Sequence, residues 1–236
     1  MSFYKSFADN RSTSAGSWLV KKMFWNVFLF VQPFLSKPES RILEIGPGRG
    51  ALCNIFLSQG FRNYTVVEPS PLLRCSFEEL DVETKDYRIP HLIEEDTSYD
   101  GIILVNVFEH LNGGSEAQEF VEEARRVLKK EGLLVIGSPD YLHLKEEFFN
   151  CDYSHNNVTT LNRTRQLFVD NGFEILRHTY TSSFIFGFSA TLVSYLVSLG
   201  FFWVRGSSHL GIVNRLYKMK LSFLRSFLIV GCKQSE

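Results

Sequence analysis

An excess of charge of either sign is absent from this chain of 236 residues. Its 25 lysines and arginines nearly balance its 26 aspartates and glutamates, which leaves a formal net charge of −1. A nucleic-acid-binding protein of this size carries a basic patch or a strongly basic total. We therefore expect no nucleic acid among the partners.

Disulfide and metal-binding patterns are missing as well. The four cysteines never form a C-x-x-C pair, and none combines with histidine at zinc-finger spacing. Cys53 and Cys75 lie in apolar helical patterns and are predicted to be small core residues. No cleavable leader is recognisable at the start of the sequence. These features predict a cytoplasmic protein without a metal site.

Acidic residues are lacking from Ile175 onward, with Glu236 as the exception. The same stretch is basic, and its cationic residues are Arg177, Arg205, Arg215, Lys218, Lys220, Arg225 and Lys233. A basic, acid-poor end on a nearly neutral chain predicts an anionic partner on that side.

The rest of the chain alternates short apolar strands with amphipathic helices. Strands are predicted at residues 41–45, 64–67, 87–89, 101–105, 133–136, 173–177 and 227–232. Helices are predicted at 18–35, 49–58, 70–80, 115–130 and 160–171, with a capping box formed by Ser115 and Gln118. This alternation is typical of a mostly parallel sheet covered by helices on both faces.

A glycine-rich turn follows the first strand, in the segment RILEIGPGRG at residues 41–50. Gly46, Gly48 and Gly50 let the backbone turn sharply and approach a ligand without an intervening Cβ. The helix that follows directs backbone N–H groups at that ligand. The turn suits the methionine part of S-adenosylmethionine or a dinucleotide pyrophosphate, because the spacing to Ala51 also fits the dinucleotide fingerprint.

Of two acidic residues near the turn, Glu44 favours the first ligand, whereas Glu68 fits both. Glu44 precedes Gly46 by two positions, where a carboxylate would repel a pyrophosphate but can orient a methionine ammonium, directly or through water. Glu68 ends the second strand, where a carboxylate accepts hydrogen bonds from ribose hydroxyls in both cofactor families.

Four motifs in order resemble the class I S-adenosylmethionine-dependent methyltransferases. They are E-x-G-P-G-x-G from Glu44, V-V-E-P-S ending at Ser70, Y-D-x-I-x-x-x-x-V-x-E-H-L from Tyr99, and R-V-L-K-x-x-G-L-L from Arg126. The resemblance extends over residues 41–180. It implies a Rossmann-like sheet of seven mostly parallel strands with an antiparallel last strand, and S-adenosylmethionine as cofactor. The segment 152–176 is similar to small bacterial members that modify sugars, quinones or lipid-linked intermediates.

The resemblance also implies roles for particular residues. Gly46, Gly48 and Gly50 would line the methionine end of the cofactor, and Glu68 would hold its ribose. Asn106 would lie beside the sulfonium at the end of the fourth strand. In the family the adenine contact usually comes from an acidic or polar residue just after the third strand, which here assigns it to Asp96, with His91 and Glu95 as alternatives.

Residues on the acceptor side are less closely defined. His155 is a candidate general base for a hydroxyl acceptor, and Asp152 and Tyr153 are alternatives. Glu109 and His110 are expected to shape a loop, because no further histidine or glutamate accompanies them at ligand spacing. Asp140 is either a substrate ligand or a turn cap.

The ends of the chain depart from the family core. We expect an N-terminal arm and helix acting as a lid at 1–40, the cofactor-binding core at 41–180, an apolar and basic insert at 181–223, and the last core strand at 224–236. Residues 184–204 carry no charge. They could span a bilayer, be wholly buried, or lie on a membrane or over a hydrophobic acceptor. A span would place the last two strands on opposite sides of the bilayer, so we favour peripheral membrane contact through 184–225.

The sequence thus predicts methyl transfer from S-adenosylmethionine to an oxygen of a sugar, quinone or lipid-linked acceptor. One alternative is a non-catalytic scaffold that keeps the fold and binds a partner or membrane through its C-terminal segment. Another is an NAD-dependent oxidoreductase.

Overall fold

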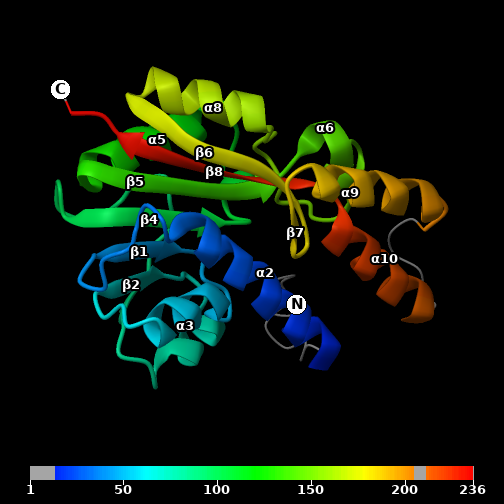
Figure 1. Cartoon of the computed structure of the whole chain (residues 1–236), viewed down its shortest axis with the longest axis horizontal. Helices are drawn as coiled ribbons and strands as arrows, with labels where there is room; N and C mark the ends of the chain where they lie inside the picture. Colours follow the sequence, from blue (N-terminus) through cyan, green and yellow to red (C-terminus); the bar gives the residue numbers. More distant parts are fainter. Residues whose placement is uncertain (1–13, 205–210, 236) are drawn as a thin grey trace.

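The computed structural model of the chain describes residues 14–204 and 211–235, and within them one sheet runs in the order β3-β2-β1-β4-β5-β8-β6-β7 (Figure 1). The strands are β1 (Ile42–Ile45), β2 (Tyr64–Val67), β3 (Glu83–Lys85), β4 (Tyr99–Val105), β5 (Leu128–Pro139), β6 (Phe173–Ser182), β7 (Ile185–Phe186) and β8 (Ser226–Lys233). The larger helices are α2 (Ser14–Val31), α3 (Ala51–Ser58), α5 (Gly114–Val127), α8 (Leu161–Asp170), α9 (Phe188–Gly200) and α10 (Gly211–Phe223). Single-turn elements are α4 (Pro71–Arg74), η1 (Cys75–Phe77), η2 (Phe108–His110), α6 (Tyr141–Leu144) and α7 (Glu147–Asn150).

Strand directions confirm the predicted Rossmann-like fold class. Strands β1 to β5 pair in parallel, whereas β8 is antiparallel to both β5 and β6. The two-residue strand β7 extends the predicted seven strands to eight by pairing with β6. Since β8 opposes both neighbours, β6 points the same way as β1 to β5.

The register of the parallel strands brings their carboxyl ends into one row. Ile45 of β1 lies between Val67 of β2 and Leu104 of β4. The chain therefore leaves these three strands at the same edge of the sheet. In an open α/β sheet this carboxyl edge is where ligands bind.

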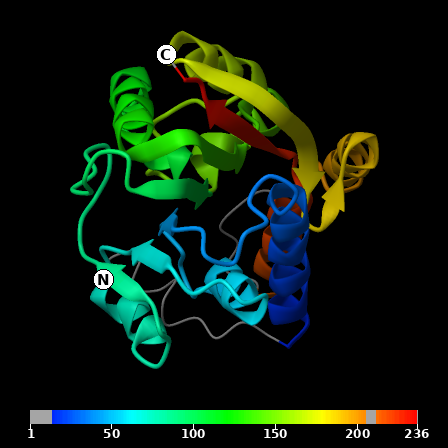
Figure 2. The same ribbon diagram turned by 60° about the vertical axis from the view of Figure 1, so that its left-hand side comes forward.

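Helices cover both faces of the sheet, as predicted (Figure 2). On one face α5 and α8 pack over a buried cluster that includes Phe120 and Phe168. On the other face α2 and α3 pack over a cluster that includes Phe28 and Phe56, whose rings meet edge to face at 5.0 Å. The second half of α2 is therefore part of the core. A lid role for the N-terminal region stays a prediction, and residues 1–13 lie outside the described ranges.

Several local predictions were wrong. Cys75, predicted to be a core residue, is exposed. The third strand is Glu83–Lys85 and not 87–89, because this edge strand exposes Glu83 and Thr84 and so carries no apolar pattern. The predicted helix 70–80 continues only as far as Arg74 before it tightens into η1. At the start of α5 no capping box forms. Gly113 occupies the N-cap position there, and the Glu116 carboxylate instead accepts a bond from the Asn112 N–H at 2.8 Å.

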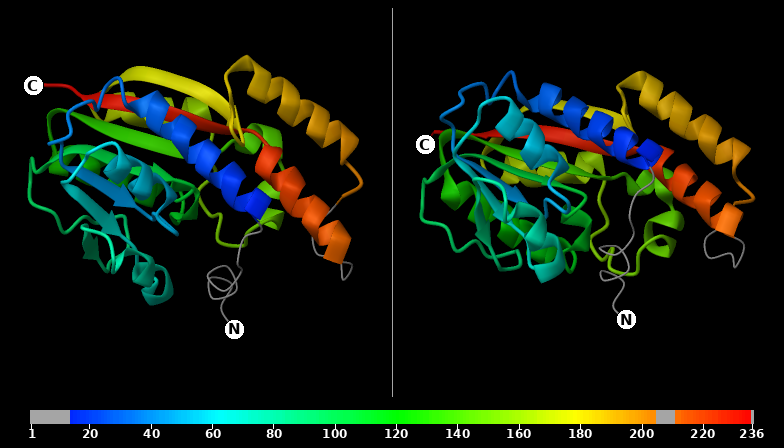
Figure 3. Two further views of the ribbon diagram at one scale, coloured as in Figure 1. Left: turned by 60° about the horizontal axis from the view of Figure 1, so that its bottom comes forward. Right: turned by 90° about the horizontal axis from the view of Figure 1, so that it is seen from below.

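The insert after β6 forms β7, α9 and α10 at the carboxyl edge of the sheet (Figure 3). Phe173 pairs with Lys233, so β6 and β8 are neighbours in one sheet, as we expected. No helix in the described ranges is long and apolar enough to cross a membrane. The wholly buried interpretation of the insert is wrong, since Phe188 is 84% exposed and Phe202 is 70% exposed.

Candidate functional site

The glycine turn between β1 and α3 adopts a backbone that only glycine takes easily. Gly46, Gly48 and Gly50 have φ values of +64°, +56° and +73°. A Cβ on Gly46 would lie 2.4 Å from Val107 Cγ2, so this glycine is required for the β1 end to pack against the loop after β4. A Cβ on Gly48 would meet nothing within 4 Å. Gly48 therefore borders space that no residue of the described ranges fills.

Glu68 reaches across from β2 to this turn. Its carboxylate accepts a bond from the backbone N–H of Ser70 at 2.9 Å, and the backbone N–H of Gly48 lies close enough to lower its pKa. Burial raises the pKa of Glu68, and its backbone donors and nearby arginines oppose that rise. The structure thus brings the predicted ribose ligand and the predicted methionine loop into direct contact.

Glu44 lies behind the turn rather than in front of it. Its Oε2 accepts a bond from the Tyr64 hydroxyl at 2.8 Å, and the carboxylate also bonds to the backbone N–H of Cys53 in the first turn of α3. Burial raises the pKa of Glu44 to about 7. The carboxyl group therefore anchors the helix that follows the glycine turn. Its contact with a methionine ammonium stays a prediction.

Asn106 occupies the expected place directly after β4. It is exposed, has a φ of +57°, and donates its backbone N–H to the Gly137 carbonyl on β5. Because Val107 next to it touches Gly46, Asn106 lies at the row of strand ends that also holds the glycine turn. This position is the one predicted for a residue near the sulfonium.

The assignment of Asp96 to the adenine needs correction. Asp96 lies three residues before the first residue of β4, at the amino edge of the sheet, and its carboxylate pairs with Arg126. That edge is opposite to the glycine turn. The alternatives His91 and Glu95 lie in the same exposed loop, where His91 pairs with Glu119 of α5.

Asp86 is a better candidate that sequence reasoning missed. Lys85 of β3 pairs with Val67 of β2, so Asp86 directly follows β3 at the carboxyl edge, level with Glu68. Asp86 forms an ion pair with Arg74 at 2.6 Å. The family pattern places the adenine contact just after the third strand. That strand was predicted at residues 87–89 instead of Glu83–Lys85, and Asp86 was therefore missed.

The acceptor-side candidates gather in one cluster next to Asn106. Glu109, His110 and His155 each offer one potential metal-ligand atom, and these three atoms lie within 4.8 Å of one another. Glu109 and His110 form the η2 turn, and the rings of His110 and His155 lie 4.9 Å apart. Asp152 joins the cluster through Ser154, whose hydroxyl donates to Asp152 Oδ1 at 2.6 Å.

Burial sets the charge of these groups. It raises the pKa of Glu109 to about 8 and lowers the pKa of both His110 and His155. His155 is therefore held neutral, with Nδ1 2.6 Å from the Phe148 carbonyl oxygen. Neutral histidine is the form that can accept a proton or bind a metal ion.

Two further predicted residues lie beside the cluster in different surroundings. Tyr153 is 77% exposed. Asp140 is fully buried after β5, and its Oδ2 accepts a bond from Arg225 Nε at 2.8 Å. Its Oδ1 has no hydrogen-bond partner in the described part of the chain, so the substrate-ligand interpretation stays open.

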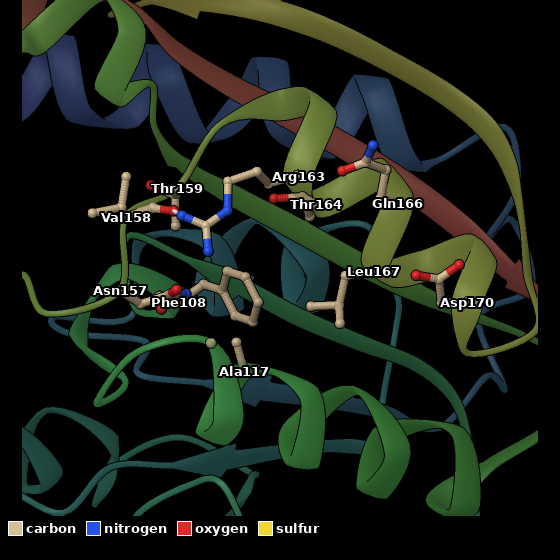
Figure 4. A pocket seen from close by; sticks show the side chains of 11 residues that line it. Phe108, Ala117, Asn157, Val158, Thr159, Arg163, Thr164, Gln166, Leu167 and Asp170 are labelled. Atoms are coloured by element: carbon tan, nitrogen blue, oxygen red, sulfur yellow. Dashed lines mark hydrogen bonds between the residues drawn. The ribbon is translucent and has the colours of Figure 1, made fainter.

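A separate hollow lies between α5 and α8 (Figure 4). Phe108, Arg163 and Leu167 are among its lining residues, and Asn157 at its rim donates to the Phe108 carbonyl at 3.0 Å. Neither the glycine turn nor Glu68 contributes to it. This hollow is therefore not the cofactor site.

Comparison with known proteins agrees with this geometry. A family model described as a methyltransferase domain matches residues 20–178, more than half of the chain. An uncharacterised protein of Methanocaldococcus jannaschii is 30% identical over 131 residues, which make up 54% of each chain. The chain thus spans about half the length of this curated relative.

Solved structures share the fold at low sequence identity. A SAM-dependent methyltransferase of Archaeoglobus fulgidus is 16% identical with a TM-score of 0.62, and the match covers 98% of this chain and 100% of that one. A 1,6-didemethyltoxoflavin-N1-methyltransferase of Burkholderia thailandensis, solved with S-adenosylhomocysteine, is 14% identical with a TM-score of 0.63 over 99% and 86%. The cyclase SpnF is 15% identical with a TM-score of 0.66 over 97% and 86%. At such identities the likeness shows the fold alone.

Proposed function

The chain belongs to the methyltransferase-domain family, and on that premise we propose that it transfers the methyl group of S-adenosylmethionine to an oxygen of a sugar, quinone or lipid-linked acceptor. The observation that carries the proposal is the contact between Glu68 and the backbone of Gly48 at the carboxyl edge of the sheet. It places the carboxylate proposed to bind the ribose beside the glycine turn, where no described residue fills the space next to Gly48.

The donor side needs few catalytic groups. A sulfonium is an activated methyl donor, and holding the acceptor in line with the S–CH₃ bond supplies much of the rate. The glycine turn and Glu68 would fix the cofactor, while Asn106 lies at the strand end where the sulfonium is expected. The protein's main task is therefore to place the acceptor oxygen correctly.

The cluster of Glu109, His110 and His155 supports an oxygen acceptor. It lies three residues along the chain from Asn106 and contains two histidines whose pKa values are lowered by burial. A hydroxyl must lose its proton as it attacks, and neutral imidazole groups assist that loss. Asp152 is connected to His110 through the Ser154 hydroxyl, which donates to Asp152 Oδ1 and lies within hydrogen-bond distance of His110 Nδ1.

The insert supports a lipid-linked or otherwise hydrophobic acceptor. Helix α9 exposes a row of large apolar side chains, namely Phe188, Leu192, Tyr195, Leu196 and Leu199. The same helix is bonded to α6, because Ser194 Oγ lies 2.7 Å from His143 Nε2. Helix α10 is bonded to α7, where Lys220 Nζ lies 3.0 Å from Glu147 Oε1. The exposed apolar surface is therefore attached to the elements that surround His155.

We further propose that this end of the molecule lies on an anionic lipid surface without crossing it. Arg215 and Lys218 on α10 are exposed, and Lys21 and Lys22 on α2 add positive charge. Phe184 joins these elements by packing against Trp18 of α2 and Phe223 of α10. Each cation near such a surface contributes about 1 kcal/mol, screened by salt, and apolar insertion adds a salt-independent part.

Vesicle flotation tests the membrane contact. The protein should float with vesicles of phosphatidylcholine and phosphatidylglycerol, and high salt should release only part of it. The double variant Leu192→Ser, Leu196→Ser should lose the salt-resistant fraction. Val169→Ser is a matched control, because Val169 is 62% exposed on α8 at a different part of the molecule. If the protein does not float with the vesicles, the exposed α9 surface would instead cover a hydrophobic acceptor.

Isotope transfer tests the acceptor. A cell extract lacking this protein is incubated with the pure protein and S-adenosylmethionine that carries a ¹³C methyl group. We expect a labelled methyl ether in the organic or glycan fraction, and no label with Gly48→Val. Label found only on nitrogen would contradict an oxygen acceptor. A thermal shift with S-adenosylhomocysteine but none with NAD separates this proposal from the oxidoreductase alternative, because a ligand that binds only the native state stabilises it.

A further inference from the structure

We propose that Glu109, His110 and His155 form a binding site for one divalent transition-metal ion such as Zn²⁺ or Mn²⁺. Their three potential ligand atoms lie within 4.8 Å of one another. Metal–nitrogen and metal–oxygen bonds of about 2.0–2.2 Å require ligand atoms somewhat closer than that, which small side-chain adjustments can supply. Residues 109 and 110 are adjacent in η2, and the His155 loop brings the third group from a distant part of the chain.

The hydrogen bonds around the two histidines leave one ring nitrogen of each free for a metal. His155 Nδ1 lies 2.6 Å from the Phe148 carbonyl oxygen, which can only accept, so Nδ1 carries the proton. His110 Nδ1 lies 2.9 Å from the Ser154 hydroxyl, whose single proton goes to Asp152 Oδ1. His110 Nδ1 must therefore donate as well. In both rings Nε2 retains its lone pair.

This arrangement matches the surroundings of metal-binding histidines in proteins. Such histidines donate their second N–H to a carbonyl, a carboxylate or a water, which fixes the tautomer and the ring orientation. Glu109 is supported in the same way, since its Oε2 accepts a bond from the Ser138 hydroxyl at 2.9 Å. Each of the three proposed ligands thus has its own supporting hydrogen bond.

The backbone holds the two halves of the site together. The Asn157 N–H donates to the Glu109 carbonyl at 3.0 Å, and the Asn157 side chain donates to the Phe108 carbonyl at 3.0 Å. These bonds tie the loop that carries His155 to the turn that carries Glu109 and His110. The ligand set is consequently preorganised rather than gathered by chance contacts of mobile side chains.

The donor set selects the class of ion. Two imidazole nitrogens and one carboxylate oxygen suit Zn²⁺, Mn²⁺, Fe²⁺ or Co²⁺, whereas Mg²⁺ and Ca²⁺ prefer oxygen ligands alone. Three protein ligands leave coordination positions for water or substrate. The sequence predicted no metal here, because His155 is remote in the chain and its approach to Glu109 and His110 depends on the fold.

A metal in this position would define the acceptor more closely, and this role rests on the proposed methyl transfer. The ion would bind an acceptor hydroxyl together with a neighbouring oxygen and lower the pKa of that hydroxyl. With both Nε2 atoms bound to the metal, the histidines would act as ligands instead of bases, so the hydroxyl proton would pass to solvent and the oxygen would then attack the methyl carbon. The C–S bond breaks with its electron pair remaining on sulfur, which yields a methyl ether and S-adenosylhomocysteine. The preferred acceptors are therefore compounds with two adjacent oxygens.

Metal titration of the chelator-treated protein tests the site without any acceptor. Calorimetry with Zn²⁺ and Mn²⁺ should show one ion bound per chain, and Co²⁺ should give the visible absorption of a nitrogen- and oxygen-ligated ion. Glu109→Gln and His155→Ala should each weaken binding more than about 100-fold, since loss of an outer-shell partner alone costs about 10–100-fold. His143→Ala is the matched control, because His143 is a half-buried histidine on α6 outside the cluster.

The outcomes separate this site from the proposed function. Glu109→Gln should keep the affinity for S-adenosylhomocysteine and a cooperative thermal transition while it loses the metal. Absence of metal binding by the folded wild type, or unchanged binding in Glu109→Gln and His155→Ala, would overturn the metal site and leave the methyltransferase assignment intact. Loss of binding in His143→Ala to the same degree would also overturn it.

Discussion

Replacing Glu44 by glutamine should remove a large part of the pH dependence of folding stability. Glu44 lies under α3, accepts a bond from Tyr64, and has a pKa raised by burial from its ordinary 4.5 to about 7. The folded state therefore binds the proton more tightly than the unfolded chain does. Below pH 4.5 the carboxyl is protonated in both states, so its contribution to stability is fully present. That contribution is lost as the pH rises through about 7.

The size of the effect follows from the two pKa values. Since one pKa unit corresponds to 1.36 kcal/mol, the change from 4.5 to about 7 amounts to about 3 kcal/mol of stability. Glutamine is neutral at every pH and keeps a carbonyl oxygen for Tyr64. Urea unfolding of wild type and Glu44→Gln between pH 4.5 and 8 should show the difference in unfolding free energy shifting by about 3 kcal/mol in favour of the variant as the pH rises.

Glu109 does not confound this comparison, because its own raised pKa is common to both proteins. Glu39→Gln serves as the matched control, since Glu39 is exposed and its change should leave the pH profile parallel to that of wild type. A difference between wild type and Glu44→Gln that stays constant across the range would refute the placement of this carboxyl in the core.

Three further outcomes follow from close contacts. Gly48→Val should keep a cooperative thermal transition, at a cost of about 1–2 kcal/mol for its positive φ, yet lose S-adenosylhomocysteine binding in calorimetry. Gly46→Val should be destabilised more strongly than Gly48→Val, because its Cβ would clash with Val107; equal melting temperatures would contradict this. Arg225→Met should lower the free energy of unfolding, measured in urea, by about 3–5 kcal/mol, because Asp140 stays buried without its partner. The double variant Arg225→Met, Asp140→Asn should recover part of that loss.

Most of the fold could be predicted because its signals are local. Strand β2 was predicted at residues 64–67 and found there, since a short run of buried apolar residues between polar turns has few alternatives. Helix α8 likewise begins after Thr160, whose hydroxyl accepts the Arg163 N–H at 3.2 Å. The prediction of strand β3 failed because this strand lies exposed at the edge of the sheet, and its sequence shows no apolar periodicity that distinguishes it from a loop.

The site could be predicted only where residues lie next to a strand end. Gly48 and Glu68 were predicted as cofactor ligands from the glycine motif and the end of the second strand, and the parallel pairing of β1 with β2 brings both to the carboxyl edge of the sheet. Asp96 was misplaced because the wrong third strand shifted the expected position from Asp86. The approach of His155 to Glu109 depends on how the loop after β5 folds back, and no local pattern encodes that path.

Calorimetric titration of S-adenosylhomocysteine into wild type and Glu68→Ala tests the central assignment most directly. Glu68 is buried at the glycine turn and is expected to accept the ribose hydroxyls. Losing a hydrogen bond to a charged group costs about 1.5–3 kcal/mol, so Glu68→Ala should bind about 10–100-fold more weakly than wild type. Equal affinities for the two proteins, or no binding by the folded wild type, would contradict the cofactor site described for this chain.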